Sequence, residues 1–156
     1  MQARPTDRRA GVRVARSVTC AAAIALAAGG VLAQEDDAGA SGSIALELNN
    51  ATDVETGCRL TYVATNDTGT ELDAMSYEVA VFDGAGVVTR LLILEFGTLP
   101  AGKTKVVQFD LTQTTCGDIS RVLVNTVAEC SAAEGADPDC LSALVTSSRQ
   151  DIDFGL

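Results

Sequence analysis

The sequence predicts an all-β domain over residues 43–150: a seven-stranded antiparallel, immunoglobulin-like sandwich with Greek-key connections. Short segments with alternating apolar residues are separated by clusters of turn-forming residues, a pattern typical of β-sandwiches. No segment carries the apolar periodicity of a long amphipathic helix. The chain has no tryptophan, which excludes an antibody-type domain with a buried core tryptophan. A small β-barrel is the alternative architecture.

The first two predicted strands each have one buried face. In the first strand, Ile44, Leu46 and Leu48 alternate with more polar neighbours, and the polar residues 49–53 then break the pattern. The second strand spans about 58–65, and a turn follows at 66–69. Its predicted buried residues are Cys58, Leu60, Tyr62 and Ala64.

The segments 72–82 and 87–96 give the strongest hairpin signal in the chain. They flank Asp83-Gly84-Ala85-Gly86, whose glycines supply the positive φ that a tight reversal needs. The second segment contains Leu91-Leu92-Ile93-Leu94, which is apolar at consecutive positions, whereas a half-exposed strand alternates. We therefore expect this strand either to be covered on both sides or to lie at a sheet edge against a partner.

Two further strands and an ambiguous last segment complete the domain. In order, the sequence predicts a turn at 99–102, a strand at about 104–111, a short helical corner at 115–118 and a strand at 121–130. Asp137-Pro138-Asp139 is then typical of a helix start, after which Leu141, Leu144 and Val145 would share a face. Residues 143–148 also suit a strand, so we expect one helical turn followed by a short closing strand.

Residues 1–33 are predicted to be a secretory signal peptide. Five arginines precede an apolar run from Val18 to Ala33, and Val31-Leu32-Ala33 offers a cleavage site of the small-x-small type. The apolar run is shorter than the ~20 apolar residues that a membrane span normally needs, so we expect it to be cleaved. An uncleaved membrane anchor is the alternative. No membrane span is expected after cleavage. Ala38-Gly39-Ala40 is a second possible cleavage site, and Arg8-Arg9 leaves twin-arginine export open beside the general secretory route.

The predicted organisation after the signal peptide is simple. Residues 34–42 form an acidic, flexible linker, residues 43–150 form the domain, and residues 151–156 form a tail. A bacterial protein with such a signal works in the periplasm or is secreted. Thiols oxidise in both places, so the cysteines are expected to pair.

Charge and composition exclude several function classes. Without residues 1–33 the chain carries six basic and twenty acidic residues, a net charge of −14. This charge repels phosphate backbones, so no nucleic-acid partner is expected. The chain has no histidine, which removes the commonest general base, the usual zinc ligand and every Ser-His or Cys-His pair. We therefore predict a non-catalytic protein without a cofactor.

Four cysteines remain in the mature chain, and we predict the disulfides Cys58–Cys116 and Cys130–Cys140. In a Greek-key sandwich the second and sixth strands run parallel, so that their starts lie at one end. Cys58 opens the second strand and Cys116 just precedes the sixth, whereas Cys130 ends the sixth. A disulfide needs Cα atoms within about 7 Å, which places Cys58 out of reach of Cys130.

Acidic loops supply the only weak candidates for a metal site. Glu134, Asp137 and Asp139, or Asp151 and Asp153, would offer oxygen ligands to calcium. A calcium loop has more closely spaced ligands and a defined glycine turn, so solvated loops are the preferred interpretation. No metal site is therefore predicted.

Several stretches of the chain together resemble a family of small exported alphaproteobacterial proteins whose members are labelled only by a twin-arginine signal domain. The resemblance covers most of residues 44–149 and implies an exported β-domain, without any activity. It is carried by Gly57-Cys58-Arg59-Leu60-Thr61-Tyr62-Val63, Val81-Phe82-Asp83, Gly86-Val87-Val88-Thr89-Arg90-Leu91, Phe96-Gly97-Thr98-Leu99-Pro100-Ala101-Gly102-Lys103, Gln108-Phe109-Asp110 and Arg121-Val122-Leu123-Val124-Asn125.

Two function classes follow from these observations. The first is a non-catalytic binding module that contacts an envelope protein through sheet edges or loops. The second is a calcium-dependent or hydrolase-like activity in acidic loops. For the second class, Glu78 and Asp110 would be an acid/base pair, although their spacing favours surface charge.

Overall fold

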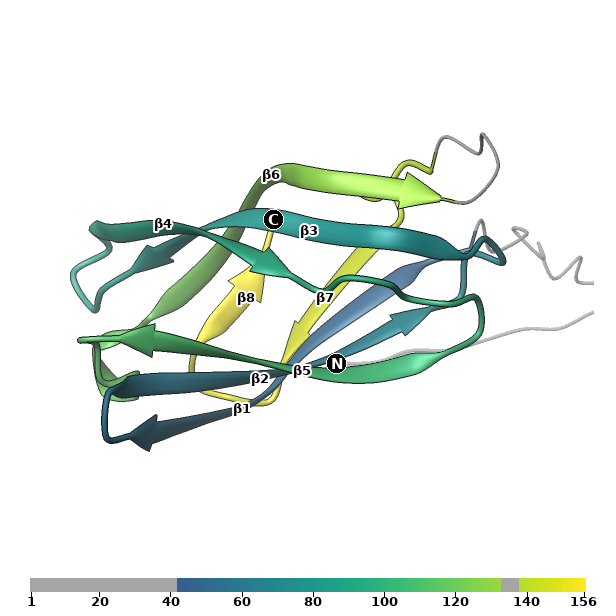
Figure 1. The fold of residues 1–156 in the computed structure, drawn as a ribbon. Coiled ribbons are helices and arrows are strands. Elements are labelled where there is room, and N and C mark those ends of the chain that lie inside the picture. The colour runs from purple at the N-terminus through teal and green to yellow at the C-terminus, as the bar shows by residue number, and fades with distance from the viewer. Residues whose placement is uncertain (1–41, 133–137) are drawn as a thin grey trace, which may run out of the picture. The chain divides into compact units, whose positions relative to one another are not determined.

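The computed structural model describes residues 42–132 and 138–156, which form two β-sheets packed face to face (Figure 1). Sheet 1 has the strand order β5-β2-β1-β7, and sheet 2 has the order β4-β3-β6-β8. The elements are β1 Ile44–Val54, β2 Gly57–Asn66, β3 Leu72–Phe82, β4 Val88–Glu95, β5 Thr104–Thr112, the 3-10 turn η1 Cys116–Asp118, β6 Arg121–Ala132, β7 Leu144–Ser148 and β8 Asp153–Gly155.

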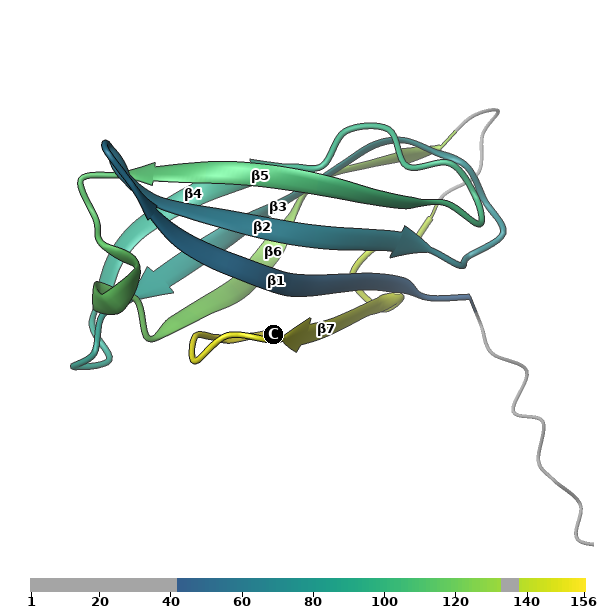
Figure 2. The ribbon, with the colours of Figure 1, turned by 90° about the horizontal axis from the view of Figure 1, so that it is seen from below.

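The sandwich prediction is confirmed, because the strands form two separate sheets rather than a closed barrel (Figure 2). The prediction of seven purely antiparallel strands is wrong: the described residues contain eight strands, and two pairings are parallel. β7 begins at the end of the sandwich where β6 ends, which is also where β1 begins, so β7 runs parallel to β1. It carries the chain to the other end, where β8 starts parallel to β6. The immunoglobulin-like type stays a prediction.

β1 continues through residues 49–53, which were expected to break it. The register between β1 and β2 shifts between Leu48 and Asn50, and pairing then resumes as far as Val54 opposite Gly57. A bulge therefore absorbs the polar stretch, and cross-strand pairing overrides its turn-like composition. Gly57 has φ of 157°, and a Cβ atom there would lie 2.0 Å from the Leu111 carbonyl oxygen of β5. This position consequently requires glycine.

The predicted hairpin joins β3 and β4, as expected from its glycine-containing loop. The Asp83 carboxylate accepts hydrogen bonds from the backbone N–H groups of Ala85 and Val87, each at 2.9 Å. Gly86 has φ of 78°, the left-handed conformation that glycine adopts without strain. β4 is an edge strand of sheet 2, so the apolar run that it carries lies at a sheet edge.

The last segment forms a turn and then two strands. The Ala143 N–H donates to the Asp139 carbonyl at 3.1 Å, and β7 follows directly, which confirms the expected order of turn and strand. The predicted shared face is wrong, because Leu144 is buried whereas Leu141 and Val145 are exposed. The prediction of a tail at residues 151–156 is also wrong, because this stretch contains β8 and two core residues, Ile152 and Phe154.

Five aromatic rings form the centre of the core between the two sheets. Tyr62 of β2 lies with its ring centroid 5.8 Å from that of Phe96 and 5.1 Å from that of Phe154. Phe96 also contacts Phe109 and Tyr77, with centroids 5.4 and 6.2 Å away. All these pairs are edge-to-face, the arrangement that the ring quadrupoles favour. The aromatic cluster thus joins strands of both sheets.

The two tyrosines of the cluster differ in their hydroxyl groups, and this predicts opposite effects of substitution. The buried Tyr62 hydroxyl has no hydrogen-bond partner among the described residues, whereas the Tyr77 hydroxyl donates to the Cys140 carbonyl at 2.8 Å. Burial raises the pKa of both hydroxyls. Tyr77→Phe should lower the free energy of unfolding by about 1–2 kcal/mol because it leaves a buried carbonyl unpaired, whereas Tyr62→Phe should be neutral or stabilising.

Urea unfolding of the two tyrosine variants and the wild type tests this difference. The two substitutions remove the same oxygen atom from the same residue type, so each is the control for the other. An equal loss of stability in both variants would contradict the assignment of an unpaired hydroxyl at Tyr62.

Two disulfides lie at opposite ends of the sandwich, and their pairing is the predicted one. Cys58 pairs with Cys116 at a Cα separation of 4.8 Å, and Cys130 pairs with Cys140 at 6.1 Å. Figure 1 shows that β2 and β6 run in the same direction, as the prediction requires. The first bridge therefore joins the start of β2 to η1, and the second joins the end of β6 to the turn before β7.

No helix in the described ranges 42–132 and 138–156 is long and apolar enough to cross a membrane. The predicted signal peptide and most of the predicted linker lie outside these ranges.

Candidate functional site

The metal-site candidates receive no support from the described residues. Glu134 and Asp137 lie outside them. The Asp139 carboxylate accepts the Ser142 N–H at 2.9 Å, which lowers the pKa of Asp139 because the bond favours the ionised form. Asp139 therefore holds the turn before β7. In the part of the chain that the structure describes, no three His, Cys, Asp or Glu residues are grouped to hold a metal ion.

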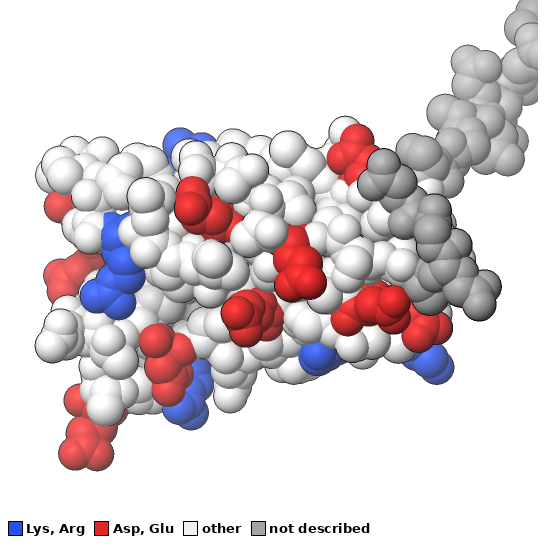
Figure 3. Space-filling view, turned by 45° about the horizontal axis from the view of Figure 1, so that its top comes forward, with Lys and Arg blue, Asp and Glu red and all other residues white. Residues whose placement is uncertain are grey.

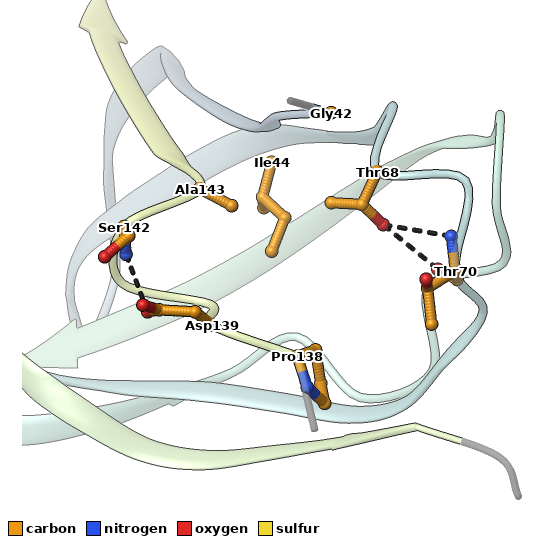
Figure 4. A pocket seen from close by; sticks show the side chains of 8 residues that line it. All are labelled: Gly42, Ile44, Thr68, Thr70, Pro138, Asp139, Ser142 and Ala143. Atoms are coloured by element: carbon orange, nitrogen blue, oxygen red, sulfur yellow. Dashed lines mark hydrogen bonds between the residues drawn. The ribbon is translucent and has the colours of Figure 1, made fainter. Parts of the chain in front are cut away.

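A cavity of about 250 Å³ lies beside this turn (Figure 4). Its polar side chains serve the local structure: Thr68 hydrogen-bonds to Asn66 at 2.7 Å, and Asp139 holds Ser142. Among the lining residues that the structure describes, Asp139 is the one titratable group, and its carboxylate is already bound to the Ser142 N–H. The cavity therefore brings no pair of titratable groups together among these residues. It is lined by Gly42, Ile44, Thr68, Thr70, Pro138, Asp139, Ser142 and Ala143.

The acid/base pair considered for Glu78 and Asp110 is not formed. Asp110 lies on β5 of sheet 1 and binds Arg59 through two hydrogen bonds of 2.6 and 2.7 Å, which lower the pKa of Asp110. Glu78 lies on β3 of sheet 2 and accepts a hydrogen bond from Asn125 at 2.5 Å. The two carboxylates belong to different sheets and each has its own partner, so both stabilise cross-strand pairs.

The outer face of sheet 1 is mostly polar, although Val106 and Val145 are exposed on its two edge strands. Beside the Arg59–Asp110 pair, polar side chains bond across its strands at 2.8–3.0 Å. Val106 is 63% exposed and lies opposite Val63 in an otherwise polar surrounding. The cross-strand pairs are Gln108–Thr61, Thr65–Thr104 and Arg149–Glu47.

The outer face of sheet 2 is more apolar. The register places Leu91 of β4, Ala80 of β3 and Leu123 of β6 in one row across three strands. Ala80 is only 5% exposed, although it does not belong to the core cluster between the sheets. Leu91 and Ile93 point outward on the edge strand and are 59% and 52% exposed. Aliphatic side chains thus run from the sheet edge to its centre.

The row next to it, toward the β3–β4 loop, extends the apolar surface. It contains Val88, Phe82 and Arg121, in register across the same three strands. The Arg121 guanidinium lies 5.8 Å from the centroid of the Phe82 ring, within the range of a cation–π contact. We call the surface formed by Phe82, Val88, Leu91, Ile93 and Leu123 the hairpin face.

Carboxylates border the hairpin face on the side away from the β3–β4 loop. Glu78 lies opposite Ile93, and beyond it Glu95 and Glu129 lie on either side of Ser76. Figure 3, in which sheet 2 is tilted toward the viewer, shows many acidic and few basic side chains over this side of the molecule. The surface therefore combines an apolar centre with a negative flank, which suits a partner with apolar and basic side chains.

The sequence located only part of this surface. The unbroken run Leu91–Leu94 indicated an unusual strand, and the structure confirms its place at a sheet edge. Phe82 and Leu123 have no signal of their own, because they are joined to β4 only through the register of three strands. The alternation of residues 121–130 places Leu123 on the face opposite Val122 and Val124, but it does not predict what lies beside Leu123.

Comparisons with known proteins give no indication of the function, so the hairpin face is the main evidence for it. The resemblance to exported alphaproteobacterial proteins stays a prediction. The chain matches no protein-family model, no curated protein and no solved structure.

Proposed function

We propose that the mature domain is a non-catalytic protein-interaction module of the periplasm or the secreted fraction, which binds an envelope protein through the hairpin face. The observation that carries this proposal is the difference between the two outer faces. Sheet 1 covers most of its outer face with paired polar side chains, whereas sheet 2 exposes Leu91 and Ile93 next to each other on β4, in a surface that the half-buried Leu123 and Phe82 extend. An exposed apolar patch with a polar rim is typical of a protein-binding surface.

The chemistry of the chain supports a binding role over an enzymatic one. The chain has no histidine, and Asp110, Asp139 and Glu78 each form a structural hydrogen bond. No specific observation favours the calcium-dependent or hydrolase-like alternative. The signal-like sequence of residues 1–33 and the two disulfides support an oxidising compartment outside the cytoplasm.

The expected partner is an envelope protein that presents apolar side chains with basic residues beside them. Its apolar residues would cover Leu91 and Ile93, which are more than half exposed. Its basic residues would lie near Glu78 and Glu95, and the mature chain's net charge of −14 would speed their approach. Nucleic acid is excluded from the proposal by the same charge.

A pair of matched double variants tests the proposal. The first variant, Leu91→Thr with Ile93→Thr, replaces two exposed aliphatic side chains of the hairpin face by threonine, which also favours strands. The second variant, Val63→Thr with Val106→Thr, makes a similar change on the outer face of sheet 1. The mature domain is immobilised, proteins from an envelope extract are identified by mass spectrometry, and the purified partner is titrated against each variant. The hairpin-face variant should bind at least about tenfold more weakly, and the sheet 1 variant should bind like the wild type.

Both double variants should unfold within about 0.5 kcal/mol of the wild type, because the substituted side chains are largely outside the core. Equal binding by the wild type and the Leu91→Thr, Ile93→Thr variant would overturn the hairpin face as the binding surface. Loss of binding in the sheet 1 variant alone would place the partner on the opposite face.

A further inference from the structure

The four edge strands of the sandwich are protected to different degrees. β7 and β8 are only five and three residues long, and β5 carries the exposed charged residues Lys105 and Asp110. Short strands and edge lysines are devices that prevent strands of two molecules from pairing. β4 is eight residues long and contains neither proline nor lysine. Its bulge at Thr89 and its arginine, Arg90, lie toward the β3–β4 loop, and the apolar run Leu91–Leu94 follows them. β4 is therefore the edge most open to an added strand.

The backbone of β4 is oriented for such pairing. The Phe96 N–H donates to the Met75 carbonyl at 2.9 Å, and hydrogen-bonded pairs in an antiparallel ladder recur at every second residue. Leu94 and Leu92 therefore bond to β3, and the N–H and C=O groups of Leu91 and Ile93 point away from it. Among the described residues, β4 makes no backbone hydrogen bond to any element other than β3.

We propose that β4 pairs antiparallel with β4 of a second copy of this chain, about a two-fold axis at Leu92. The two copies of sheet 2 then form one continuous sheet of eight strands. In this register Leu91 lies opposite the partner's Ile93, and the reverse pair forms on the other side of the axis. Apolar cross-strand pairs of this kind stabilise antiparallel strands.

Other registers that keep the same side chains on the outer face of the sheet are less favourable. The period of two allows only shifts by two residues, since other shifts would turn the apolar residues of the partner to the wrong face. One such shift places Leu91 opposite the partner's Glu95, and the other places Ile93 opposite the partner's Thr89. In the proposed register, Glu95 lies opposite the bulge of the partner's β4 at Thr89, so no charge faces an aliphatic residue or a like charge on the outer face.

A second copy is favoured as the occupant because β4 is complementary to itself. A two-fold interface uses the same patch on both subunits, and the central residues Leu91, Leu92 and Ile93 satisfy this when the axis passes through the middle one. β4 carries one positive and one negative residue, Arg90 and Glu95, so the strand adds no repulsion despite the acidic chain. The inference does not require the proposed function. Both involve Leu91 and Ile93, but the dimer forms through the backbone edge of β4, whereas the envelope partner would cover the outward side of the same side chains.

The first test is the mass of the purified mature domain in solution. Analytical ultracentrifugation over a range of concentrations should show a monomer–dimer equilibrium for the wild type. Leu91→Lys, which places a charge on the β4 edge, should weaken dimerisation at least about tenfold. Val106→Lys, which places the same charge on the β5 edge, should leave the dimer intact. A wild type that stays monomeric at high concentration would overturn the proposal, whether the edge is then open or taken by another protein.

The second test fixes the register and does not depend on the effect of a charge. Leu92 faces its own copy across the axis in a non-hydrogen-bonded pair, where Cα atoms lie about 4.5 Å apart and a disulfide is geometrically allowed. Leu92→Cys should form a covalent dimer under oxidising conditions, and Val106→Cys should stay monomeric. Covalent dimers of Val106→Cys alone would move the interface to β5 and overturn the proposal.

The two proposals fail in different ways. A dimer that captures no envelope protein removes the proposed function and keeps the β4 interface. A monomer whose envelope partner is lost on Leu91→Thr with Ile93→Thr removes the β4 interface and keeps the proposed function.

Discussion

Replacement of Cys58 and Cys116 by alanine is expected to lower the free energy of unfolding by about 4 kcal/mol, and by more than the same replacement of Cys130 and Cys140. The first bridge closes a loop of 58 residues and the second a loop of 10 residues. By the chain-entropy estimate the second contributes about 3 kcal/mol, because a shorter loop restricts the unfolded chain less. Cys58 is also fully buried, so its replacement removes packing in the core.

The two double-alanine variants are each other's control, because both remove one disulfide and the same atoms. Urea unfolding of the mature domain gives the two losses, and peptide mapping without reduction verifies that the remaining bridge is the native one. A larger loss on removal of Cys130–Cys140 would contradict loop length as the deciding factor. Fragments that join Cys58 to Cys130 would contradict the strand order itself.

The disulfide pairing could be predicted because it depends on strand order alone. Two parallel strands that begin at the same end place Cys58 near Cys116, and a cysteine at the end of the second strand is too far away. Alternation likewise located the core of β2, since Cys58, Leu60, Tyr62 and Ala64 are all buried. These predictions succeeded because each rests on a local period or on the reach of the chain.

Predictions failed where pairing between distant segments decides the structure. Residues 49–53 are turn-like in composition, yet hydrogen bonding to β2 keeps them in β1. β8 is only three residues long, too short for a period to appear, and its place depends on β6 and on Phe154 entering the aromatic cluster. Composition describes a segment in isolation, whereas the sheet supplies the energy that orders it.

The candidate surface could likewise be predicted only in part. The run Leu91–Leu94 was visible because it departs from alternation within one segment. Whether the acidic residues form a site could not be predicted, because the sequence does not show whether their carboxylates converge or bind separate partners. In the structure Asp110 binds Arg59 and Asp139 binds Ser142, so both have local structural roles.

Truncation of Phe96 tests the centre of the fold. Phe96→Ala is expected to lower the free energy of unfolding by about 3–5 kcal/mol, the range for a buried phenylalanine. Its ring is 1% exposed and contacts Tyr62, Tyr77 and Phe109, which belong to strands of both sheets. The loss would thus remove edge-to-face contacts and leave a cavity between the sheets.

Phe82→Ala is the matched control, because it removes the same ring from the outer face of sheet 2. Phe82 is only partly buried, and its ring makes a cation–π contact with Arg121, so the expected loss is about 1 kcal/mol. Urea unfolding of both variants under identical conditions measures the difference. If the two losses were equal, the rings between the sheets would not be the main source of stability. A large loss confined to Phe96→Ala would instead show that the two sheets are held together mainly through the aromatic cluster, because the outer ring packs against one sheet alone.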